Sequence, residues 1–70
     1  MEKNMTEIPR GREVIFEFQP VGRIMRVTAM DTDSMTEVVI QCPVHLGEAV
    51  FKKNALQKLE YILRKKGIIS

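Results

Sequence analysis

Apolar and polar residues alternate along three short segments in the first two-thirds of the chain. The segments span residues 13–19, 24–30 and 36–42, with Pro20-Val21-Gly22 and Asp31-Thr32-Asp33-Ser34 between them. Alternation places successive side chains on opposite faces of a strand, and Pro, Gly, Asp and Ser favour turns. The pattern predicts a three-stranded antiparallel meander. Its apolar face would carry Val14, Phe16, Phe18, Met25, Val27, Ala29, Val38, Ile40 and Cys42.

From Glu48 onward, apolar residues recur with the period of an α-helix. They share one stripe, which consists of Phe51, Ala55, Leu56, Leu59, Ile62 and Leu63. Gly47 is an acceptable N-cap, and Gly67 can end the helix in a Schellman motif, with Ile68 folding back on Leu63. We expect one helix over residues 48–66, packed on one sheet face. The predicted fold is therefore α+β, in the order β-β-β-α.

The register of the first two strands depends on the length of their connecting loop. A three-residue loop would place Arg26 beside Phe16 on the core face, where an unpaired charge is costly. A four-residue loop over residues 20–23 pairs Phe16 with Val27 and sets Glu17 opposite Arg26 on the outer face. We therefore expect the four-residue loop.

Seventy residues are enough for one small domain. We expect residues 1–12 to be a disordered arm, because they are polar and end in Pro9-Arg10-Gly11-Arg12, and residues 13–70 to form the domain. The core is thin, so association with a second copy would add stability. The single cysteine, Cys42, excludes an internal disulfide, residues 1–7 lack the apolar run expected of a secretory signal, and no stretch approaches roughly 18 consecutive apolar residues. These features predict a cytoplasmic protein.

Candidate chemistry is sparse. Cys42 and His45 are the only cysteine and histidine, and no further Cys or His exists to complete a zinc site. A nucleophile–base pair is the functional alternative, but a buried cysteine followed by a loop histidine is the simpler interpretation. Asp31-Thr32-Asp33 opens like a calcium loop, yet the loop's glycine and final acid are missing, so we expect a turn. We expect no catalytic residue, no metal and no cofactor.

The outer face of the sheet is the first candidate interaction surface. It would carry Ile15, Glu17, Arg26, Thr28 and Val39, and the expected register lines up Ile15, Thr28 and Val39 across the three strands. Such an apolar stripe indicates either a dimer surface or simply the preference of β-branched residues for strands.

The outer side of the helix is the second candidate. Residues 46–70 hold six Lys/Arg against two Asp/Glu, a balance of +4. The basic surface would consist of Lys53, Lys58, Tyr61, Arg64 and Lys65. Cations around an aromatic ring can bind the phosphates of a nucleic acid. Nucleic-acid binding is less favoured than protein interaction, because the sheet face is acidic and lacks an aromatic pair for base stacking.

Four strings in the chain carry a resemblance to other sequences. They are the string EVIFEF at residues 13–18, the strings VTA at 27–29 and TEV at 36–38, and the helix string from Ala55 to Lys66. Together they resemble a family of short, uncharacterised bacterial proteins about as long as this chain of 70 residues. The resemblance implies a small cytoplasmic domain of unknown function and transfers no active site. We therefore expect a non-enzymatic interaction module that pairs with itself or with an unknown protein.

Overall fold

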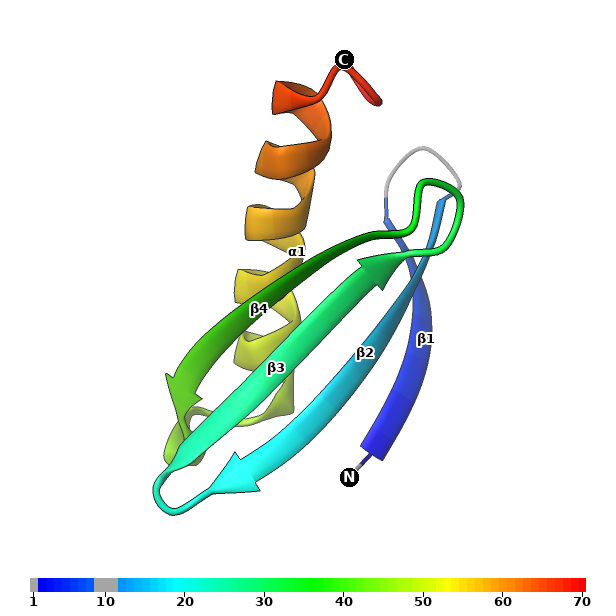
Figure 1. The fold of residues 1–70 in the computed structure, drawn as a ribbon. Helices are drawn as coiled ribbons and strands as arrows, with labels where there is room; N and C mark the ends of the chain where they lie inside the picture. The colour runs from blue at the N-terminus through cyan, green and yellow to red at the C-terminus, as the bar shows by residue number, and fades with distance from the viewer. Residues whose placement is uncertain (1, 9–11) are drawn as a thin grey trace.

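Four antiparallel strands form one open sheet in the order β1-β2-β3-β4, followed by a single helix (Figure 1). The computed structural model describes residues 2–8 and 12–70. The elements are β1 (Glu2–Ile8), β2 (Arg12–Val21), β3 (Ile24–Asp31), β4 (Thr36–Pro43), the 3₁₀ turn η1 (Val44–Leu46) and α1 (Glu48–Lys65). The expected meander of three strands with a C-terminal helix on one face is confirmed in β2, β3, β4 and α1.

Strand β1 was not expected. Residues 2–8 were assigned to a disordered arm, but they pair antiparallel with β2 from Glu2↔Phe18 to Ile8↔Arg12. The physical reason is that β2 would otherwise present a row of unpaired backbone groups along its outer edge. The remaining residues assigned to the arm, 1 and 9–11, lie outside the described part of the chain, and residue 12 opens β2.

The register between β2 and β3 differs from the expected one by two residues. Phe16 pairs with Ala29 and Glu17 with Thr28, so the connecting turn is the two-residue Gly22-Arg23. Gly22 has φ 61°, which suits the first central position of a type II′ turn, and such turns match the twist of paired strands. Since side chains alternate with period two, the two-residue slip leaves every side chain on its expected face.

Pro20 lies inside β2, opposite Met25, where its missing N–H needs an explanation. In a two-residue hairpin the pair that flanks the turn, here Val21↔Ile24, exchanges backbone hydrogen bonds, so the next pair does not. The nitrogen of Pro20 therefore points away from β3. Because β1 pairs only as far as Phe18, no strand requires that donor.

The core is a single apolar layer between α1 and one face of the sheet. Helix α1 packs across β3 and β4 (Figure 1). The layer's buried side chains are Val14, Phe16, Phe18, Val27, Ala29, Val38, Cys42, Phe51, Ala55, Leu59, Leu63 and Ile69. Met25, Ile40, Leu56 and Ile62 pack against it in part. The expected faces of the sheet and of the helix are thus the ones that meet.

The helix ends in the expected Schellman motif. Gly67 has φ 76°, and its N–H donates to the carbonyl of Arg64 at 2.9 Å. The N–H of Ile68 donates to the carbonyl of Leu63, also at 2.9 Å. The apolar contact differs from the expectation, because Ile69 joins the core while Ile68 stays 36% exposed.

Met35, the last residue of the β3–β4 loop, is the one described non-glycine residue with a positive φ, at 59°, and its side chain is 67% exposed. The left-handed conformation is unfavourable for a residue with a Cβ, whereas Asn tolerates it. We expect Met35→Asn to raise the free energy of unfolding by about 0.5–1 kcal/mol in urea titrations. Met35→Ala keeps the strain and should bring no such gain; equal gains from both substitutions would contradict this account.

Candidate interaction surfaces and a buried ion pair

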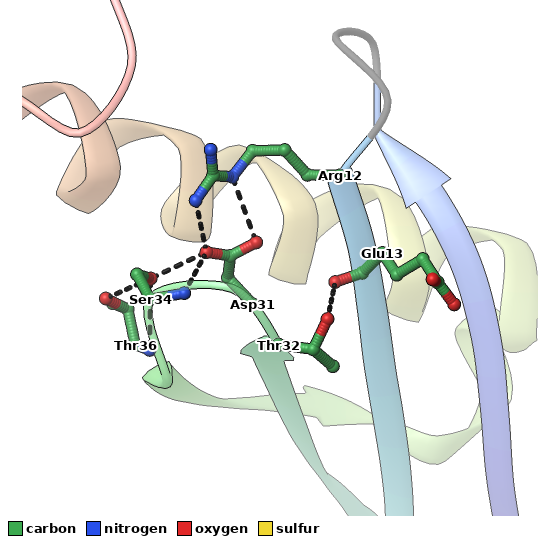
Figure 2. A network of polar contacts seen from close by, with 6 residues as sticks. All are labelled: Arg12, Glu13, Asp31, Thr32, Ser34 and Thr36. Carbon is green, nitrogen blue, oxygen red and sulfur yellow. Dashed lines mark hydrogen bonds and ion pairs between the residues drawn. The ribbon is translucent and has the colours of Figure 1, made fainter.

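The most highly organised polar group in the structure links the start of β2 to the β3–β4 loop (Figure 2). Arg12 donates from Nε to Asp31 Oδ1 at 3.0 Å and from its NH2 nitrogen to Oδ2 at 2.8 Å. Ser34 donates to Oδ2 from its backbone N–H at 3.0 Å and from its hydroxyl at 2.6 Å. The Thr32 hydroxyl donates to the carbonyl of Glu13 at 3.2 Å. The strand end and the loop are thus joined by both side chains and backbone.

Asp31 is completely buried, and the side chain of Arg12 is 17% exposed. The Arg12 hydrogen bond is the main cause that lowers the pKa of Asp31 from 3.8 to about 2, and Ser34 adds to it against the opposing effect of burial. The same hydrogen bond raises the pKa of Arg12. Both carboxylate oxygens have donors, so this group has the character of a structural clamp.

The expected turn is confirmed over residues 32–35, where Ser34 donates to Asp31, but Arg12 was missed as the partner of Asp31. A signal for the pair was present in the sequence. Arg12 continues the inward series of Val14 and Phe16, and Asp31 continues that of Ala29, at a spacing of two residues. A cation and an acid that both fall on the core face at one end of a sheet are expected to pair.

The outer sheet face holds all five residues expected there, but it groups them differently. The expected stripe of Ile15, Thr28 and Val39 is wrong, because Thr28 and Val39 share their row with Glu17. The two-residue shift in register is the reason. Ile15 lies instead in the row of Met30 and Glu37, and Arg26 lies between Gln19 and Gln41 rather than opposite Glu17. Arg26 is exposed and the other four expected residues are half-buried.

A shallow hollow of about 360 Å³ lies on this face near the β2–β3 turn. Val21, Ile24, Arg26 and Gln41 line it. Val21 and Ile24 are 58% and 37% exposed, so two exposed apolar residues line the hollow together with the guanidinium-bearing Arg26. Sequence reasoning assigned Val21 to a turn and therefore missed its place in this surface.

The basic residues of the helix do not form one uniform surface. Lys58 turns toward the sheet edge and donates from Nζ to the carbonyl of Val39 at 3.2 Å. Tyr61 is 60% exposed, and Lys65 Nζ lies 5.9 Å from its ring centroid. Lys53 and Arg64 are exposed on the helix. The structure thus keeps Tyr61 and Lys65 together and gives Lys58 a separate contact.

Cys42 and His45 lie in different environments, one buried and one exposed. Cys42 lies in the core layer at the end of β4, whereas His45 is exposed in η1. Over residues 2–8 and 12–70, no three His, Cys, Asp or Glu side chains come together as metal ligands would. No helix in that part of the chain is long and apolar enough to cross a membrane.

The ion pair makes stability depend on acidic pH. Because the pKa of Asp31 is lower in the folded state, its contribution is complete above about pH 5 and is lost as the pH falls to about 2. We expect the wild-type chain to lose about 2 kcal/mol of unfolding free energy over that range through Asp31. Denaturant titrations at several pH values would measure it. Asp31→Asn should lack this component and Asp33→Asn, at an exposed neighbour, should keep it; the same pH profile in all three chains would contradict the assignment.

Comparison with known proteins places the chain in a family without assigning an activity. No curated protein and no solved structure is significantly similar to it. One family sequence model matches residues 11–66, which include both members of the Arg12–Asp31 pair and all ten expected surface residues. The chain therefore belongs to the family described as Domain of unknown function (DUF6898).

Proposed function

We propose that this protein is a non-enzymatic cytoplasmic interaction module that forms a homodimer through the outer face of its sheet. The observation that carries the proposal is that α1 packs on one sheet face only, and no described element covers the other (Figure 1). Over β2–β4, the apolar residues on that open face include Ile15, Val21, Ile24, Met30 and Val39. Apolar area of this kind on a sheet is typical of an interaction site.

The size of the face supports weak rather than obligate association. With about 3.3 Å per residue and about 4.8 Å between strands, β2–β4 present an area of roughly 25 by 15 Å. Two such faces would bury roughly 750 Å² in total, below the roughly 1,200 Å² at which the range for stable, specific interfaces begins. We therefore expect a dimer in the micromolar range.

The outer edge of β4 is less suited to self-association than the face. An edge strand pairs with another chain through its free backbone groups. Here the ammonium group of Lys58 already donates a hydrogen bond to the carbonyl of Val39, in the middle of β4, so a positive charge lies along that edge. A second strand would have to displace this contact, so the contact favours association through the face.

Sedimentation equilibrium at micromolar concentrations tests the homodimer. We expect the wild-type chain to approach twice its mass of 8.1 kDa, and Ile15→Lys or Val39→Lys to sediment as monomers, because each substitution buries a charge in the interface. Gln57→Lys, on the exposed side of α1, is the matched control and should still dimerise. Circular dichroism would show that the variants remain folded. A wild-type chain that stays at 8.1 kDa would refute the homodimer.

The second candidate is nucleic-acid binding through the outer side of α1. The exposed ring of Tyr61, with Lys65 beside it and Lys53 and Arg64 on the same helix, supports this function. The contact of Lys58 with Val39 counts against it, since it withdraws one cation.

Electrophoretic mobility shifts with mixed-sequence DNA and RNA test this candidate. Retardation at about 50 mM salt that weakens as salt is added would support it. Lys53→Ala and Arg64→Ala should then reduce binding more than Arg23→Ala, which removes an exposed cation from the β2–β3 turn. No retardation at low salt would dispose of the candidate.

A further inference from the structure

Over β2–β4, the open sheet face has an acidic end and a basic end. Glu13, Glu17 and Glu37 lie toward the β3–β4 loop, whereas Arg26 lies near the β2–β3 turn. The guanidinium group of Arg26 forms no hydrogen bond or ion pair with any residue that the structure describes, and Arg26 borders the apolar hollow. A face with separated charges can be complementary to a second copy of itself, but only in certain orientations.

Two limiting orientations of a two-fold axis in the plane between the faces bring two such faces together. If the axis runs parallel to the strands, each row faces the same row of the partner, and residues of the central strand β3 face themselves. Arg26 would then oppose the partner's Arg26, a like-charge contact in a desolvated interface. If the axis runs perpendicular to the strands, the direction of the strands is reversed and one end of the face meets the other.

We propose that the second copy packs in the perpendicular orientation, with the axis between the row of Glu17, Thr28 and Val39 and the row of Gln19, Arg26 and Gln41. This inference rests on the proposed homodimer and specifies its geometry. The axis exchanges these two rows, so Arg26 lies above Thr28 of the partner subunit and next to Glu17 of the partner subunit. Neighbouring strands are about 4.8 Å apart and facing sheets about 10 Å, a gap that Arg and Glu side chains span together.

The same axis matches the apolar residues. It exchanges the row of Ile15, Met30 and Glu37 with the row of Val21, Ile24 and Pro43. Ile15 then faces Val21 of the partner subunit, and Met30 faces Ile24 of the partner subunit, so the half-buried apolar residues of one copy enter the hollow of the other. The exposed side chains of Val21 and Ile24 thereby lose their contact with water.

Charge reversal tests this geometry by sedimentation or by concentration-dependent fluorescence anisotropy. Arg26→Glu and Glu17→Arg should each weaken the dimer about tenfold or more, because each creates two symmetry-related like-charge contacts. The double variant Arg26→Glu with Glu17→Arg should recover affinity to within a few-fold of the wild type. Lys53→Glu, which changes the net charge as Arg26→Glu does but lies on the exposed helix, is the control and should have little effect.

The outcomes separate this inference from the proposed function. A wild-type chain that is monomeric at every concentration overturns the homodimer itself. A wild-type dimer that tolerates Arg26→Glu, or a double variant no tighter than the single ones, leaves the homodimer but overturns the perpendicular arrangement. If Glu17→Arg does not fold, Arg26→Glu and the salt dependence of the wild-type dimer decide, since added salt must weaken a dimer held by this pair.

Discussion

The burial of one apolar layer between α1 and a single face of the sheet is the interaction on which the other features depend. Phe16, Leu59 and Leu63 are completely buried there, and the layer draws on β2, β3, β4 and the helix. The part of the chain that the structure describes has one α-helix to cover the sheet. Covering one face therefore leaves the other in water, with apolar residues that a monomer does not need to expose.

At one end of this layer an ion pair, Arg12–Asp31, takes the place of apolar contacts. Asp31 occupies a completely buried position on the core face, where an unpaired carboxylate would be costly, and the two nitrogens of Arg12 compensate for it. The pair also joins the first residue of β2 to the last residue of β3. Lys58 has a comparable role at the edge of β4, where its ammonium group occupies a backbone carbonyl that another strand would use.

Sequence reasoning succeeded with features that depend on neighbouring residues and failed with those that depend on distant ones. Alternation placed Phe16 and Ala29 on the core face, and helical periodicity placed Leu59 and Leu63 there. The prediction of the register was wrong because the four-residue and the two-residue loops put the same side chains on the same face. Only the geometry of the turn at Gly22 distinguishes the two loops. The grouping of Ile15 with Thr28 on the outer face failed with it.

By itself, the sequence determined β2, β3 and β4, the helix and its glycine end, and the side chains that each element turns inward. These properties follow from periods of two and of 3.6 residues and from local turn and cap chemistry. Only the tertiary structure decided that residues 2–8 pair with β2, that Arg12 reaches Asp31, and which residues are neighbours on the open face. These depend on contacts between distant segments, for which several arrangements bury the same apolar layer and differ only in backbone pairing and charge compensation.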